Sequence, residues 1–94
     1  MSTRDHDTSA VFAISVAAER ADTRIQNLRV YERRGLLTPS RTAGGTRLYS
    51  EADIAVLQRI ATLLAEGLNL AGIARVLELE AEVDRLRHQV RARH

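Results

Sequence analysis

One long interruption of helical periodicity, at residues 36–50, constrains the fold of this chain more than any other feature. The stretch LLTPSRTAGGTRLYS carries Pro39, Gly44 and Gly45 between two short apolar runs. Proline and paired glycines end helices, and a glycine pair between short apolar runs is typical of a hairpin turn. We therefore expect two β-strands here, with Gly44 and Gly45 at the tip.

Two short helical patterns precede this hairpin. The first covers VAAERA, residues 16–21, with Ser15 as its predicted N-terminal cap. After a break, where Asp22 or Thr23 is expected to cap the next helix, RIQNLRVYERRG predicts a second helix that stops at Gly35. Two short helices joined by a tight turn are typical of a helix-turn-helix.

Two further helical patterns follow the hairpin. Ser50 and Asp53 form a capping-box pattern, and the helix they open is expected to stop at Gly67. Asn69 is expected to cap the next helix. The residues predicted to face inward are Ile54, Leu57, Ile60, Ala61 and Leu64 in the first helix, and Leu70, Ile73, Val76 and Leu77 in the second.

The C-terminal part carries a heptad pattern. Leu79, Val83, Leu86 and Val90 are spaced by four, three and four residues, which predicts a short coiled-coil dimerisation helix over residues 79–94. An amphipathic tail that packs on its own domain is the alternative. The expected organisation is a disordered arm at 1–10, a domain at 11–78 that holds the helix-turn-helix and the hairpin, and this helix.

Positive charge is concentrated around the helix-turn-helix pattern. Residues 20–47 hold seven arginines against Asp22 and Glu32, a local excess of +5 in a chain with net charge +2. Such an excess favours a polyanionic partner. Arg41 and Arg47 bring charge to the hairpin, whose glycines would let backbone amides approach phosphate. The fold class predicted is mainly α, a winged helix-turn-helix with a two-stranded β wing and a C-terminal dimerisation helix, which binds double-stranded DNA.

Composition argues against several other functions. The chain lacks cysteine, and His6, His88 and His94 lie far apart without clustered carboxylates, so we expect no metal site and no cofactor. No set of residues at catalytic spacing is present, and we expect no enzyme. No apolar run approaches the length of a membrane span, and the first residues lack the apolar segment of a signal peptide, so we expect no membrane contact and a cytoplasmic, nucleoid-associated protein.

The stretch LRVYERRGLLTPSRTAGGTRLYSEADI resembles the signature of the MerR family of bacterial transcription regulators. Within that family, VFAISVAAERA and EGLNLAGIARVLEL are most similar to the heat-shock repressor branch, the HspR-like proteins. The likeness runs from about Val11 to the end of the chain. One departure is Asp22, which stands where members commonly have glycine.

This resemblance implies a homodimeric repressor of chaperone genes that binds an inverted repeat, with the chaperone DnaK as corepressor. It points to Arg29, Tyr31, Arg47 and Tyr49 as DNA-backbone contacts. Gln26 and Asn27 would lie near base edges, where their amides can pair with adenine. The remaining candidate DNA contacts are Ser15, Arg24, Arg33, Arg41, Gly44 and Gly45.

Several alternatives stay open at this stage. An architectural, excisionase-like DNA-binding protein would share the winged helix, and a protein-interaction module would use the charged tail. Tyr31 and Tyr49 could belong to the core, although edge positions with hydroxyls toward DNA are favoured. Glu32 is expected to pair with Arg29 or Arg33 along its own helix. Glu78, Glu80, Glu82 and Asp84 are read as a solvated acidic face, with chaperone docking as the alternative.

Overall fold

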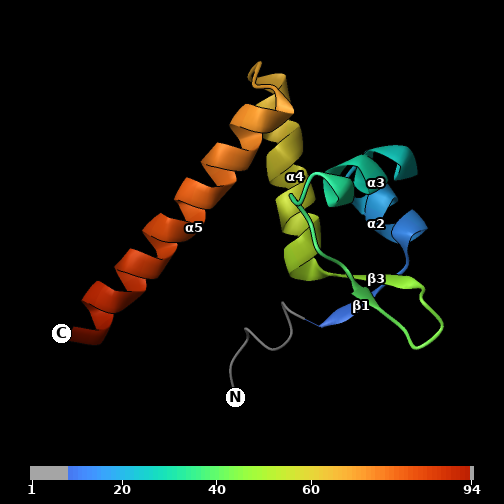
Figure 1. The fold of residues 1–94 in the computed structure, drawn as a ribbon, viewed down its shortest axis with the longest axis horizontal. Helices are drawn as coiled ribbons and strands as arrows, with labels where there is room; N and C mark the ends of the chain where they lie inside the picture. The colour runs from blue at the N-terminus through green and yellow to red at the C-terminus, as the bar shows by residue number, and fades with distance from the viewer. Residues whose placement is uncertain (1–8, 94) are drawn as a thin grey trace. The chain divides into compact units, whose positions relative to one another are not determined.

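The computed structural model describes residues 9–93, which form a mainly helical chain with one small antiparallel sheet (Figure 1). The predicted disordered arm falls largely on residues 1–8, which lie outside the described residues. Two compact units, divided between Thr62 and Leu63, are described separately below. The elements are β1 (Ala10–Phe12), α2 (Ile14–Arg20), α3 (Ile25–Arg33), β2 (Ser40–Arg41), β3 (Arg47–Ser50), α4 (Glu51–Ala65) and α5 (Leu70–Arg93). Among the described helices, none is long and apolar enough to cross a membrane.

The predicted helix-turn-helix is formed by α2 and α3. Asp22 in the turn adopts a positive φ of 55°, a left-handed conformation that aspartate tolerates better than most residues. Helix α3 ends as predicted at Gly35, whose φ is 76°. The Gly35 amide donates to the Glu32 carbonyl and the Leu36 amide to the Tyr31 carbonyl, which is the Schellman pattern of helix ends.

Both cap predictions in this region are wrong. The N-cap of α2 is Ala13, without a side-chain cap hydrogen bond, because the helix starts earlier and places Ser15 within its first turn. Neither Asp22 nor Thr23 caps α3. Its N-cap is Arg24, again without a side-chain cap hydrogen bond, since Asp22 and Thr23 form the turn itself.

The hairpin prediction is confirmed, and a third strand extends the sheet. The strand order is β1-β3-β2, with both pairings antiparallel. Strand β1, which the sequence did not predict, pairs Ala10 with Ser50 and Phe12 with Tyr49 around an irregularity in register. At the wing tip, Thr42 and Thr46 exchange hydrogen bonds, and Gly45 has φ 88°. That backbone conformation requires glycine.

The capping box at the start of α4 is confirmed in both directions. The Ser50 amide donates to Asp53 Oδ2 at 2.9 Å, and the Asp53 amide donates to Ser50 Oγ at 3.0 Å. The buried side of α4 runs through Ile54, Leu57, Ile60 and Leu63. Ala61 and Leu64, predicted to face inward, are exposed. The next buried residue after Ile60 is Leu63, three positions on, and Leu64, four positions on, lies outside the buried side.

Residues 9–62 enclose a mostly aliphatic core, with two tyrosines, that holds the helix-turn-helix together. Its buried apolar members are Ala17, Ala18, Ala21, Leu28, Tyr31, Leu37, Tyr49, Ile54, Leu57 and Ile60. Around it, Arg20 connects three elements. Its guanidinium lies 5.0 Å from the Phe12 ring centroid and donates to Glu51 at 2.6 Å, while Gln58 donates to its carbonyl oxygen.

Residues 63–93 consist of the end of α4, a turn and the long helix α5. Gly67 has φ 96°, and Asn69 Oδ1 accepts the Gly72 amide at 2.8 Å, so the predicted stop and cap are both confirmed. Ile73 is fully buried. Helix α5 runs without a break through the border expected between residues 78 and 79.

Candidate nucleic-acid interface

Helix α3 presents a polar, largely basic face to solvent. Gln26, Arg29 and Arg33 are exposed and follow one another at spacings of three and four residues, which places them on the same side of a helix. The opposite side carries Leu28, fully buried, and Tyr31, 6% exposed. The core thus fixes α3 in an orientation that leaves its basic side accessible, with Arg24 exposed just before the helix.

The first turn of α3 also exposes two amide side chains. Asn27 donates from Nδ2 to Thr23 Oγ1 at 3.0 Å, so its side chain is oriented by the turn that precedes the helix. Gln26 lies beside it on the exposed side. Both amides can pair with adenine, and both lie at the N-terminal end of α3, directly after the turn.

The edge position predicted for Tyr31 is wrong. Its side chain belongs to the core, and burial raises the pKa of its hydroxyl, while a hydrogen bond with Thr23 acts in the opposite direction. Tyr31 therefore packs in the core beside the turn of the helix-turn-helix, and a phosphate contact by its hydroxyl stays a prediction.

Tyr49 is also misplaced by the sequence prediction. It is fully buried in β3, and burial raises the pKa of its hydroxyl. The hydroxyl has no hydrogen-bond partner within residues 9–93. A side chain enclosed in this way cannot touch a phosphate while the core stays folded, so Tyr49 leaves the set of expected DNA contacts.

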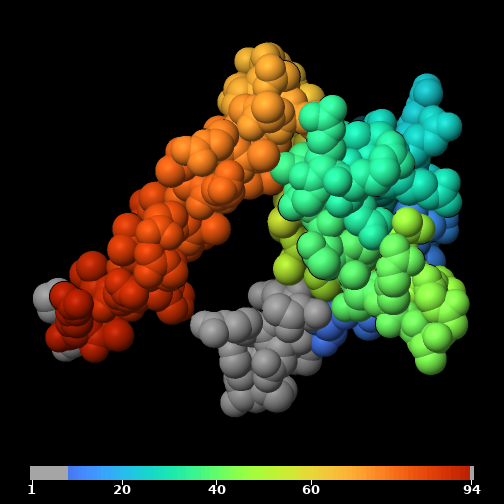
Figure 2. All heavy atoms as spheres, in the orientation of Figure 1, coloured from blue at the N-terminus to red at the C-terminus, as the bar shows by residue number. Residues whose placement is uncertain are grey.

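The two wing arginines are held by α3. Glu32 accepts from Arg47 Nε at 2.5 Å and from Arg41 Nη2 at 2.9 Å. The hydrogen bond from Arg47, followed by that from Arg41, lowers the pKa of the Glu32 carboxyl. The expected pairing of Glu32 along its own helix is thus wrong, because the hairpin brings better-placed guanidinium groups to it. Figure 2 shows α3 and the hairpin on one face of the unit formed by residues 9–62.

The two glycines at the wing tip are exposed, and the amide of one of them is already hydrogen-bonded. The Gly45 amide donates to the Thr42 carbonyl at 2.9 Å, so this amide closes the turn and is not directed at a ligand. Gly44 and Gly45 are both exposed. Ser15 is exposed in the first turn of α2.

Sequence reasoning missed the Glu32 network and strand β1. A hairpin with its tip at the glycines places Arg41 opposite Arg47, but no signal in the sequence shows that both arginines reach Glu32, because they lie 9 and 15 residues away from it. Nothing in the sequence marked Ala10–Phe12 as a strand, since three residues are too few for a periodic pattern.

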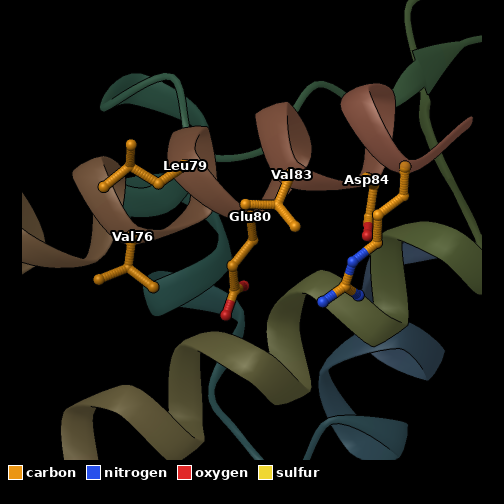
Figure 3. A pocket seen from close by; sticks show the side chains of 6 residues that line it. Val76, Leu79, Glu80, Val83 and Asp84 are labelled. Atoms are coloured by element: carbon orange, nitrogen blue, oxygen red, sulfur yellow. The ribbon is translucent and has the colours of Figure 1, made fainter. Parts of the chain in front are cut away.

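Helix α5 carries an exposed apolar ridge, which we define as Leu79, Val83, Leu86 and Val90. Their exposed fractions lie between 44% and 57%. Two shallow hollows follow this ridge, and the first extends it back to Val76 (Figure 3). Beside the ridge, Arg85 and Glu82 form an ion pair within the helix.

Comparison with known proteins decides the family. The family model described as MerR HTH family regulatory protein matches residues 12–80. The chain belongs to the MerR family. This agrees with the resemblance found in the sequence, and a family of regulatory proteins agrees with the expectation that the chain is not an enzyme.

Two individual relatives match most of this chain. A Streptomyces coelicolor protein named as heat shock protein HspR is 47% identical over 85% of this chain and 54% of its own length. The transcriptional repressor CarH of Myxococcus xanthus is 42% identical over 77% of this chain and 26% of its own length. The chain thus spans about half or less of these two relatives.

Solved structures share the fold. A MerR-family regulator from Bacillus cereus superposes with a TM-score of 0.68 at 30% identity, covering 86% of this chain and 65% of the other. HiNmlR, described as a MerR family regulator lacking the sensor domain and bound to promoter DNA, gives a TM-score of 0.68 at 25% identity, covering 85% of this chain and 67% of the other. The predicted fold class is confirmed.

Proposed function

We propose that this protein is a sequence-specific DNA-binding repressor of the HspR-like branch, which acts as a homodimer on an inverted repeat near heat-shock or chaperone genes. The observation that carries the proposal is the exposed basic side of α3 beside a wing that carries Arg41 and Arg47. The 47% identity to a protein named as heat shock protein HspR favours that branch over others in the family.

The proposed contacts fall into two groups. Arg24, Arg29 and Arg33 bind phosphates along the backbone, together with the wing, while Gln26 and Asn27 read base edges in the major groove. This division assigns affinity and register to the arginines and sequence preference to the amides.

Dimerisation is proposed through the ridge on α5. Four large apolar side chains at heptad spacing are about half exposed, and a second copy of the same helix would cover them. A symmetric dimer presents two recognition helices, and an inverted repeat has the matching symmetry.

Selection of bound fragments from the genomic DNA of the source organism tests this proposal. Purified protein is expected to enrich an inverted repeat upstream of chaperone genes, and Arg29→Ala is expected to enrich it much less, because each protomer loses one phosphate contact. Enrichment of direct repeats or of unrelated fragments would move the function to the architectural, excisionase-like alternative. Absence of enrichment relative to Arg29→Ala would favour a protein-interaction module.

The corepressor is tested on the selected fragment. Purified DnaK is expected to increase the affinity of the protein for that fragment without binding the DNA alone. Unchanged affinity would remove the chaperone from the proposal and leave the repressor in place.

A further inference from the structure

A single carboxylate on α3 holds both strands of the wing. Glu32 accepts from Arg47 Nε at 2.5 Å and from Arg41 Nη2 at 2.9 Å. Arg41 also donates from Nη1 to the Gly45 carbonyl oxygen at 3.0 Å. Through these bonds the recognition helix is connected to β2, to β3 and to the tip of the wing.

Strand register brings two positive charges together, and the carboxylate of Glu32 offsets their repulsion. Arg41 and Arg47 are directly opposite partners in the β2–β3 pair, and like charges in such positions repel each other. The Glu32 side chain is 21% exposed, compared with 45% for Arg41 and 29% for Arg47. The carboxylate is thus the most buried member of the network and the one that fixes the other two.

The charge balance of the network runs against simple polyanion binding. One carboxylate and two guanidinium groups leave a net charge of +1, so the protein itself compensates one of the two wing charges. A wing that served only to raise affinity for phosphate would keep both charges uncompensated. What the carboxylate adds instead is a fixed position of the wing beside α3.

We propose that Glu32 is a positioning residue that sets DNA specificity by holding the wing arginines at one distance from the base-reading side of α3. The inference rests on the proposed function. Phosphate contacts determine the register in which side chains meet base edges. A wing that can swing accepts phosphates in several registers and therefore tolerates more sequences.

Glu32→Gln tests the inference, and Glu51→Gln serves as the matched control. Glu51 also pairs with an arginine in the same unit, at 2.6 Å, but its partner Arg20 lies on α2 and not on the wing. Affinities for the selected operator and for random-sequence duplex are measured over a range of KCl concentrations. For Glu32→Gln we expect roughly fivefold tighter binding to random DNA and a salt slope steeper by about one per protomer. The ratio of operator to random affinity is expected to fall by roughly tenfold, whereas Glu51→Gln keeps the wild-type ratio.

Glu32→Asp supplies a second variant, because it keeps the charge and shortens the reach of the carboxylate. It is expected to lower the operator-to-random ratio without changing the salt slope. A purely structural role for Glu32 would instead weaken binding to both DNAs equally, and that result would overturn the inference. Equal effects of Glu32→Gln and Glu51→Gln would also overturn it, since net charge alone would then be responsible. If the unsubstituted protein showed no preference over random DNA, the proposed function would fall, and this inference with it.

Discussion

Helices α4 and α5 carry similar patterns of apolar residues with opposite outcomes. In α4, Ile54, Leu57 and Ile60 are at most 2% exposed, whereas in α5 Val83 and Leu86 are 44% and 46% exposed. Spacing of three and four residues determines which side of a helix is apolar. It does not determine what covers that side, which is core in α4 and, in our proposal, a second copy of the chain in α5.

The largest expected effect comes from truncation on the covered side of α4. Leu57 is 2% exposed, and replacement by alanine leaves a cavity in the core, so we expect Leu57→Ala to lower the free energy of unfolding by about 3 kcal/mol. Urea denaturation in dilute solution measures this. Leu86→Ala is the matched control, with an expected loss below about 1 kcal/mol. Equal losses would contradict the difference between the two helices.

Truncation on the ridge of α5 is expected to act on association instead. Each copy in a symmetric dimer would lose roughly 1.4 kcal/mol of apolar burial in Leu86→Ala, so the dimer dissociation constant is expected to rise about 100-fold. Sedimentation velocity over a concentration series measures it. Glu78→Ala, on the same helix outside the ridge, should leave association unchanged. Association that survives Leu86→Ala would place the interface elsewhere.

Several local signals were read correctly from the sequence, whereas the caps of α2 and α3 and the longer-range pairing of Glu32 were not. The capping box at Ser50 and the stops at Gly35 and Gly67 depend on residues within a few positions, and the structure confirms all three. The partners of Glu32 lie 9 and 15 residues away, so they depend on how the hairpin folds back. The sequence shows that Tyr49 is a large aromatic residue in the hairpin, but only the packing of the folded core determines how deeply it is buried.

Acid is expected to weaken the wing network of Glu32. Its carboxyl pKa is lowered in the folded protein, first by the Arg47 hydrogen bond, so its stabilisation is complete above the ordinary glutamate pKa of about 4.3 and is lost as pH falls through the lowered value. We expect Glu32→Gln to be less stable than wild type by about 1 kcal/mol at neutral pH. The difference should vanish in strong acid.

Urea unfolding of both proteins over a pH series measures this difference. Glu82→Gln removes the exposed pair with Arg85 on α5 and should show no comparable pH-dependent difference. A Glu32→Gln difference that is independent of pH would show that the charge of Glu32 is not what stabilises the wing.

The smallest expected effect concerns Tyr49. Because its buried hydroxyl has no partner within residues 9–93, Tyr49→Phe should leave stability within about 1 kcal/mol of wild type or raise it, and DNA affinity should not change. Tyr31→Phe is the control, since it loses a hydrogen bond with Thr23 and should destabilise by about 1 kcal/mol. Thermal unfolding and fluorescence anisotropy measure the two properties. Loss of DNA affinity in Tyr49→Phe would show that the Tyr49 hydroxyl contributes to DNA binding after all.

The salt dependence of DNA affinity tests the DNA-binding role of α3 and the wing most directly. Fluorescence anisotropy with a labelled duplex is measured over a series of KCl concentrations for wild type, Arg29→Ala and Arg75→Ala. Arg75 is exposed on α5 and serves as the control. We predict a steep linear fall of log affinity with log salt, shallower by about one per protomer in Arg29→Ala and unchanged in Arg75→Ala. A shallow wild-type slope, or equal effects of the two substitutions, would contradict the assignment of DNA binding to this surface.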